Sequence, residues 1–263
     1  MRNMPKILRG MVFPFMALVA WEFLAVNGLI NVLFFPPPSI ISKTLIQMLR
    51  DGILVKHLFT SLARLAYGFF VAVILAVPMG VLVGRVQVFR YWITPALSFL
   101  QQIPPIAWIP IFILWLGIEE ASKIAVIVYA SFFPLFLNTV QGVSSVDPKL
   151  IEVGRAFMLS PWEMIRWVIV PSALMSIFVG LRLGLSNCWR ALVGAELIGA
   201  SAGIGYLIIE GRQLFQPDKI FVAIFTIGLA GLLIDFGLKK LEKRLFPLRD
   251  WEPGCFPHPN LCL

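Results

Sequence analysis

One apolar run near residue 190 carries the polar side chains best suited to acting on a solute inside a membrane. These side chains recur at helical spacing, so one face of a helix would present Arg182, Ser186, Asn187 and Arg190, with Glu196 at the outer end. A charged group in the hydrocarbon layer costs at least ~2.5 kcal/mol and therefore needs a partner or a role. A cationic stripe would lower the barrier for an anion. The alternative is that carboxylates such as Glu196 or Asp235 pair with the arginines, which we favour for Arg182 and leave open for Arg190.

A second run, residues 91–118, is interrupted by prolines at positions 95, 104, 105 and 110. Proline has no N–H and breaks the helical hydrogen-bond ladder, which frees carbonyl groups toward a cavity. Gln101 and Gln102 stand just before Pro104 and Pro105. Broken helices near the bilayer midplane commonly mark a substrate path, so we place these four residues on it. A packing kink is the alternative interpretation.

Enzymatic chemistry is poorly supported by the remaining polar residues. His57 and His258 are the only histidines, and no nucleophile, metal-ligand or paired-carboxylate constellation lies within the apolar runs. The glycine-rich segment 199–205 has no following lysine and no preceding strand, so it predicts a tight outer re-entrant turn, not a phosphate-binding loop. Cys255 and Cys262 lie in a proline-broken tail that we interpret as loose. We expect no enzyme activity, no metal and no cofactor bound by this chain.

Composition identifies the solvent of this chain as lipid. Only 14% of the 263 residues are charged, against about 25% in soluble domains, and 59% are hydrophobic, with a mean hydropathy of +0.87. The net charge of +8 could indicate nucleic-acid binding. The basic residues lie between long apolar runs and form no patch with aromatic residues, which excludes that class of partner.

A helix needs about 20 apolar residues to cross the hydrocarbon core. The sequence predicts an all-α integral membrane protein with six transmembrane helices, over residues 12–33, 65–84, 91–118, 124–146, 167–181 and 220–234. The last two runs continue through Arg182 and Asp235, whose charges must face protein or a water-filled cavity. We assign residues 1–247 to a single transmembrane domain and residues 248–263 to a cytoplasmic tail.

The orientation follows from the basic residues of the loops, which gather on the cytoplasmic side. With both termini inside, that side collects Arg2, Lys6, Arg9, Arg85, Arg90, Lys149, Arg155, Arg166, Lys239, Lys240, Lys243, Arg244 and Arg249. The outer side collects Lys43, Arg50, Lys56, Lys123, Arg212 and Lys219. On that outer side, Ser39 can cap an amphipathic helix over residues 40–50, lying along the membrane surface.

The longest cytoplasmic connection, residues 144–166, has the signals of two short helices. Asp147 followed by Pro148 is a helix start, and Ser160 followed by Glu163 at the third position is a capping box. We expect helices over 148–158 and 161–168. Glu152 and Arg155 would share one face of the first, either as a solvated surface pair or as part of a rigid contact surface for a cytoplasmic partner.

Three separated segments of the chain resemble bacterial ABC importer permeases. Glu152-Val-Gly154-Arg-Ala-Phe-Met-Leu-Ser160-Pro-Trp162, continuing to residue 174, resembles the Glu-Ala-Ala loop of that family of binding-protein-dependent transport inner-membrane components. Residues 103–119 and 181–206 are similar to its nitrate, sulfonate, taurine and bicarbonate branch. The resemblance covers roughly residues 10–247. Met158 departs from it where the loop usually has glycine, and Met175 where it often has proline.

The resemblance implies a docking surface and a set of partners. In the family this loop, here residues 147–168, forms coupling helices that dock on an ATPase. The docking residues would be Glu152, Val153, Gly154, Arg155, Ala156, Ser160, Pro161 and Trp162. Two cytoplasmic ATPase subunits would bind ATP and Mg²⁺, a second permease copy would complete the path, and a soluble periplasmic or lipid-anchored binding protein would deliver substrate.

The resemblance also implies a function and a location. We expect a permease subunit in the bacterial inner membrane, surrounded by lipid, that imports a small oxyanion (a sulfonate, taurine, nitrate or bicarbonate) by alternating access. ATP hydrolysis would take place on the separate ATPase. A stand-alone channel or secondary transporter, or a permease for a vitamin precursor, remains the alternative.

Overall fold

The computed structural model describes residues 6–245, so the predictions for the tail 248–263, including Cys255 and Cys262, lie outside the described residues. Every regular element within that range is a helix, which confirms the all-α prediction. In chain order these are α1 (Lys6–Val26), α2 (Pro38–Arg50), α3 (Ile53–Arg85), α4 (Gln87–Gln101), α5 (Pro105–Leu116), α6 (Glu120–Ser144), α7 (Pro148–Ala156), α8 (Pro161–Glu163), a π-helix (Met164–Ile169), α9 (Val170–Gly199), α10 (Ile204–Gln213) and α11 (Pro217–Leu245).

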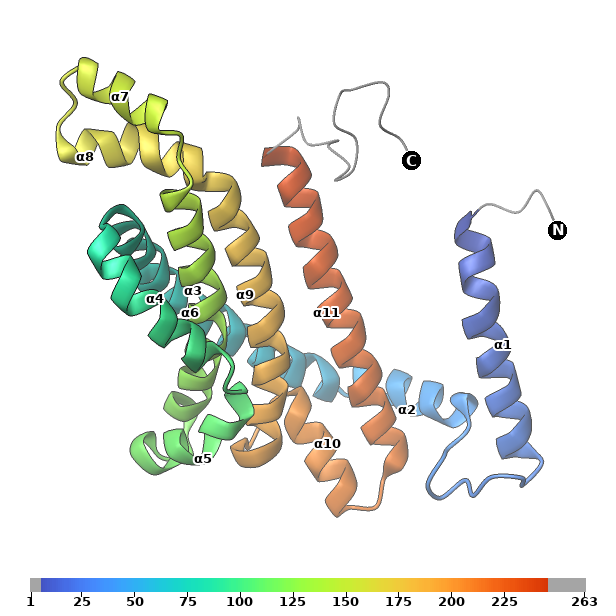
Figure 1. Ribbon diagram of the computed structural model, residues 1–263. Helices are drawn as coiled ribbons and strands as arrows, with labels where there is room; N and C mark the ends of the chain where they lie inside the picture. Colours follow the sequence, from blue (N-terminus) through green and yellow to red (C-terminus); the bar gives the residue numbers. More distant parts are fainter. Residues whose placement is uncertain (1–5, 246–263) are drawn as a thin grey trace.

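Three long helices form the centre of the fold, with α6 packed along both α3 and α9 (Figure 1). Glycines bring the helix backbones together. A Cβ on Gly80 of α3 would lie 2.7 Å from the Thr139 Cβ of α6, and one on Gly142 of α6 would lie 2.5 Å from the Ser176 Cβ of α9. Small residues at such contacts are the usual means by which helices associate in a membrane, where no hydrophobic driving force acts between them.

The described residues contain four helical stretches long and apolar enough to cross a membrane: α3, α6, Pro161–Gln213 with α9 inside it, and α11. Helices α4 and α5 qualify only as a pair, and they meet at 95°, so the expected span 91–118 is a broken span or a re-entrant loop. The apolar part of α1, Phe15–Val26, is shorter. The structure therefore gives four or five spans by length and composition, and the sixth remains a prediction.

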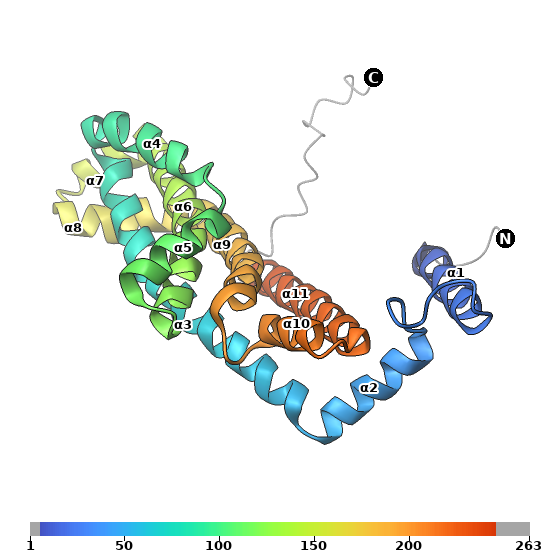
Figure 2. The ribbon, with the colours of Figure 1, turned by 90° about the horizontal axis from the view of Figure 1, so that it is seen from below.

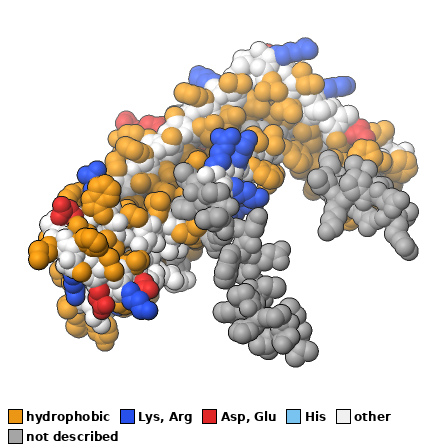
Figure 3. All heavy atoms as spheres, turned by 90° about the horizontal axis from the view of Figure 1, so that it is seen from above, with side chains coloured by type: hydrophobic (Ala, Val, Ile, Leu, Met, Phe, Trp, Pro, Cys, Tyr) orange, Lys and Arg blue, Asp and Glu red, His pale blue; other side chains and the backbone are white. Residues whose placement is uncertain are grey.

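The elements gather at two ends of the bundle. Helices α7 and α8 lie at the same end as the beginning of α1 and the end of α11, and α5 and α10 lie at the opposite end (Figure 1). Hydrophobic side chains occupy much of the surface seen from the end with α7 and α8 (Figure 3), and in the most apolar window of α11 only 11% of the residues are buried. A surface of this kind fits lipid better than water.

Helix α2 confirms the amphipathic helix expected after the first apolar run. Ile41 and Met48 are its buried residues, and Figure 2 shows it between α1 and the start of α3. The predicted Ser39 cap is wrong: Pro37 occupies the N-cap position, and the helix begins at Pro38, because proline already has the φ angle of a first helical residue. The Ser39 N–H donates instead to the carboxylate of Glu22 in α1, at 3.0 Å.

Candidate functional site

A cavity of about 320 Å³ lies where α4 meets α5, against the middle of α6 and α9. Of the residues predicted for the translocation path, its wall contains Gln101, Pro104, Pro105, Asn187 and Arg190. The rest of the wall is largely apolar and consists of Ile103, Ile106, Tyr129, Ala130, Phe133, Pro134 and Ala191. The broken helix and the cationic helix therefore face each other across one cavity, as the residue pattern of each run suggested separately.

Tyr129 stabilises the break between α4 and α5. Pro104 has no N–H to donate to the Leu100 carbonyl, which would be its partner in a continuous helix. The Tyr129 hydroxyl donates to that carbonyl at 2.8 Å, and the Ile103 N–H donates to it at 3.1 Å. The freed carbonyl is thus satisfied by the neighbouring helix α6, which fixes the position of the 95° bend.

Arg190 is the cation on the cavity wall. Its Nε donates to the Ser186 carbonyl at 3.1 Å, and its Nη2 donates to Oδ1 of Asn187 at 2.9 Å, so both bonds stay within α9. Among the described residues no carboxylate forms an ion pair with it. The charge is therefore open to an incoming anion, for which a guanidinium is a strong hydrogen-bond donor.

Arg182 has different surroundings. Its Nη2 lies 3.2 Å from Oδ1 of Asp235, and its Nη1 lies 3.2 Å from Oε2 of Glu242, so it ties α9 to α11. Carboxylate pairing was the interpretation that the sequence favoured for this residue. Arg182 does not line the cavity, and neither do Ser186 and Gln102, although the Ser186 carbonyl orients Arg190.

Glu196 is also absent from the cavity wall and belongs to a buried network of its own. It is 1% exposed and accepts hydrogen bonds from the Ser61 hydroxyl at 2.7 Å, Arg64 Nη1 at 2.9 Å and the Gly205 N–H at 2.9 Å. A buried carboxylate with three donors, one of them a cation, is held in place by the surrounding helices.

The Arg64 guanidinium is the centre of this buried network. Besides Glu196, it donates to both carboxylate oxygens of Glu120 at the start of α6 and to the Ala202 carbonyl after α9. One side chain therefore joins helices α3, α6 and α9 and the turn that follows α9. The sequence did give a signal, because His57, Ser61 and Arg64 recur on one face of α3. The predicted span began after Arg64 and so left these residues in a loop.

The network also supports the tight turn predicted for residues 199–205. Helix α9 ends at Gly199 and α10 begins at Ile204. Gly203 has φ +120°, and a Cβ there would overlap the Glu196 carboxylate, so only glycine fits. Its N–H donates to Nδ1 of His57 at 3.0 Å.

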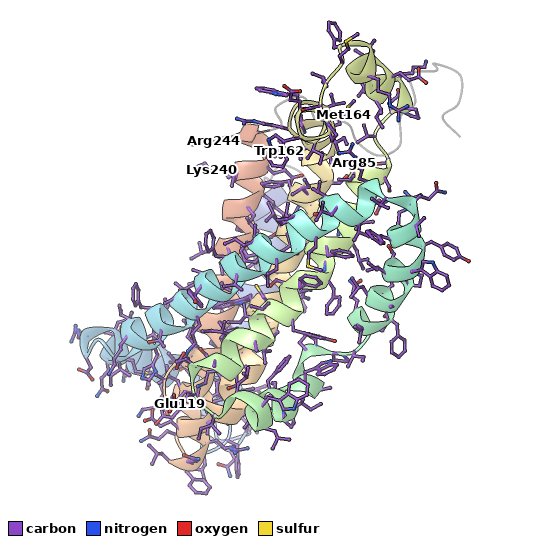
Figure 4. The ribbon with its side chains drawn as sticks, turned by 90° about the vertical axis from the view of Figure 1, so that its left-hand side faces the viewer. Arg85, Glu119, Trp162, Met164, Lys240 and Arg244 are labelled. Carbon is purple, nitrogen blue, oxygen red and sulfur yellow. The ribbon has the colours of Figure 1, made fainter. Side chains whose placement is uncertain are left out.

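The two short helices predicted between residues 147 and 168 are present, with their caps. The Asp147 side chain accepts from the Lys149 N–H at 2.9 Å, and Ser160 and Glu163 form the capping box in both directions. Figure 4 shows Trp162 and Met164 at this end of the molecule, far from Glu119 at the other. The second helix differs from the prediction: three α-helical residues continue as the π-helix Met164–Ile169 and then as α9.

Met158 makes the turn between α7 and α8 with a left-handed backbone, φ +53°, and is 93% exposed. Glycine adopts this conformation most readily, so a methionine here is strained. Helix α7 consequently ends at Ala156, before Met158, and not at residue 158 as predicted. Behind the turn, Gly154 packs directly against the Met164 side chain.

The surface of α7 and α8 that faces away from the bundle is exposed and available to a partner. Val153, Phe157 and Trp162 expose 53%, 76% and 69% of their area. Glu152 and Arg155 are both exposed, and no ion pair joins them in the described part of the chain. Arg85 at the end of α3 donates to the Pro161 carbonyl at 3.0 Å and links this surface to the bundle.

Comparison with known proteins gives a consistent assignment. Residues 68–247 match the family described as binding-protein-dependent transport system inner membrane component. The protein assigned as the aliphatic sulfonates transport permease SsuC of Bacillus subtilis is 35% identical over 94% of this chain and 90% of its own. The taurine transport system permease TauC of Escherichia coli is 34% identical over 88% and 86%. The bicarbonate transport system permease CmpB of Synechocystis is 34% identical over 88% and 85%.

Among solved structures, the fold is similar to a chain of the MetNI methionine ABC transporter in an inward-facing conformation. The TM-score is 0.64 at 18% identity, and the match covers 73% of this chain and 96% of that one. At that identity the likeness concerns the fold alone.

Proposed function

Because this chain belongs to the family of binding-protein-dependent transport system inner membrane components, we propose that it imports a small oxyanion as the permease subunit of an ATP-driven transporter. Sulfonate, taurine, nitrate and bicarbonate are the candidate substrates, in keeping with relatives named for sulfonate, taurine and bicarbonate transport. One observation carries the proposal: Arg190, which pairs with no carboxylate among residues 6–245, lies on the wall of the cavity at the α4–α5 break. Such a position favours an anion inside the membrane.

We infer the orientation from the two ends of the bundle. The end with α7, α8, the beginning of α1 and the end of α11 is cytoplasmic, because the basic residues concentrate there. With α1 and the α4–α5 pair as spans, the subunit has six transmembrane helices in the inner membrane. The path is completed by a second permease copy, and a binding protein delivers substrate to the end with α5 and α10.

Alternating access in this proposal starts at the surface of α7 and α8. Two ATPase subunits, which bind ATP and Mg²⁺, dock there and move the surface when they close. Helix α8, the π-helix and α9 form one continuous helical stretch, so a displacement at Trp162 passes to Asn187 and Arg190. The Arg85 hydrogen bond passes the same displacement to α3 and hence to α4. Both walls of the cavity then move together.

Arg190→Gln tests the anion path. In proteoliposomes with the ATPase and binding protein, we expect uptake of the anion to fall about tenfold or more, because a charge-assisted hydrogen bond contributes ~1.5–3 kcal/mol. The control is Arg182→Gln, which removes a cation of the same helix that does not line the cavity and should leave uptake unchanged. Equal uptake by the Arg190→Gln variant and the wild type would overturn the role of the cavity in anion transport. Preferential uptake of an uncharged heterocycle would favour the vitamin-precursor alternative.

A further inference from the structure

Helix α11 has one face that no other described helix covers along most of its length. Its most apolar window is 11% buried, against 33% in α3 and 56% in α6. Leu229, Leu233 and Phe236 recur on that face at helical spacing and expose 61%, 63% and 64% of their area. An apolar stripe this exposed needs a partner that is itself apolar.

The same face becomes cationic at the end of the helix. Lys240, Lys243 and Arg244 continue the spacing, and all three are exposed. None of them forms an ion pair within residues 6–245, whereas the neighbouring Lys239 pairs with Asp235 at 2.7 Å. Figure 4 shows Lys240 and Arg244 together at the end of α11, toward the same end of the molecule as Trp162. The face thus consists of an apolar stripe that ends in three unpaired positive charges.

The other end of the stripe leads into an apolar pocket of about 220 Å³ between α1, α2 and α11. Apart from Ser42 and Thr226, its lining is apolar: Leu18, Trp21, Pro38, Ile41, Leu45, Val222, Phe225 and Leu229. Leu229 belongs both to this pocket and to the exposed stripe. The pocket therefore continues the stripe beyond Leu229, away from the cationic end of the helix.

The length of the stripe matches one leaflet. From Leu229 to Lys240 the helix rises about 16 Å, at ~1.5 Å per residue. Half of a hydrocarbon core of ~30 Å is about 15 Å. We propose that an anionic phospholipid binds this face, with its phosphate on Lys240, Lys243 and Arg244 and one acyl chain along Leu233 and Leu229 into the pocket.

A second copy of this chain fits the face less well. In a two-fold contact, both copies contribute the same surface patch to the interface. A contact through α11 would therefore bring the three cations of one copy toward those of the other. The two carboxylates nearest these cations on α11, Asp235 and Glu242, are turned toward Arg182 of α9 and could not neutralise that repulsion. A lipid phosphate supplies the missing negative charge and an apolar chain in one molecule.

Native mass spectrometry of the complete transporter, released from membranes of defined lipid, tests the proposal. The probes are phosphatidylglycerol and phosphatidylcholine with the same acyl chains. We expect retained phosphatidylglycerol and little phosphatidylcholine on the wild type. The variant Lys240→Gln, Lys243→Gln, Arg244→Gln should bind phosphatidylglycerol on the order of a hundredfold more weakly, since each cation near a phosphate contributes about fivefold. Millimolar inorganic phosphate should not displace the lipid, because it cannot occupy the apolar stripe.

The matched control is Lys43→Gln, Arg50→Gln, Lys56→Gln, which removes three exposed cations at the opposite end and should retain the lipid. If the first variant folds poorly, Lys240→Arg with Lys243→Arg keeps the charge and should bind as the wild type does. Equal retention of the two lipids, or unchanged binding after the first triple substitution, would overturn the proposal. So would disulfide cross-linking of Leu233→Cys between two permease copies, which would show that protein covers this face.

Discussion

The buried Arg64 network allows a quantitative prediction. The substitution Arg64→Gln removes the cation that bonds to Glu120, Glu196 and the Ala202 carbonyl. Arg64 is 5% exposed and Glu196 1%, so the carboxylate stays buried without its counter-charge. Removing one partner of a buried ion pair typically costs ~3–5 kcal/mol. For a chain of this size that cost corresponds to a fall in Tm of roughly 6–20 °C.

The Arg182 pair provides the matched control. Arg182 also bonds to two carboxylates, but its side chain is 33% exposed and those of Asp235 and Glu242 are 32% and 22% exposed. Water screens such pairs, and we expect Arg182→Gln to cost at most about 1 kcal/mol. Thermal unfolding of the purified protein in detergent, followed by circular dichroism, measures both variants under the same conditions.

A double-mutant cycle then separates the ion pair from the packing of Arg64. Arg64→Gln combined with Glu196→Gln should cost less than the sum of the single substitutions, by about 1–3 kcal/mol, because the neutral amide no longer needs a cation. If Arg64→Gln and Arg182→Gln lower the stability equally, or if the two substitutions in the cycle are additive, the reasoning about this network is refuted.

Substitutions at three further positions test other parts of the structure. Met158→Gly should raise stability by up to about 1 kcal/mol in the same unfolding assay, since glycine adopts φ +53° without strain, whereas Met158→Ala should bring no gain. Tyr129→Phe should cost about 1 kcal/mol by removing a donor to the Leu100 carbonyl, and a stability equal to wild type would count against its role at the bend. Glu152→Lys should abolish substrate-stimulated ATP hydrolysis with normal membrane insertion; unchanged hydrolysis would mean that α7 is not the docking helix.

Features specified by neighbouring residues could be predicted from the sequence. Asp147 and Ser160 form their predicted caps because a cap needs only residues within one turn. The prolines at positions 104 and 105 likewise predict the break between α4 and α5, because neither has an N–H to donate to the carbonyl four residues earlier in the helix. The size of the bend was not predictable, since it depends on Tyr129 of another helix.

The buried network was missed for the opposite reason. Arg64 and Glu196 are 132 positions apart, and the residues around either one do not predict that the two side chains are in contact. Without that pairing, only the charge of Glu196 and its place on the helix indicate a role for it. The pairing of Arg182 was predictable, because a carboxylate, Asp235, stands at a similar depth in the next predicted span and the two charges can be matched by position.

The central claim is that this chain transports its substrate only when a separate ATPase drives it. Uptake of a radiolabelled sulfonate into proteoliposomes measures this directly, with the permease alone and with the ATPase, the binding protein and ATP added. We expect uptake only in the complete system, and its loss when ATP is replaced by a non-hydrolysable analogue. Uptake by the permease alone, at a rate independent of ATP, would contradict the account and identify a channel or secondary transporter.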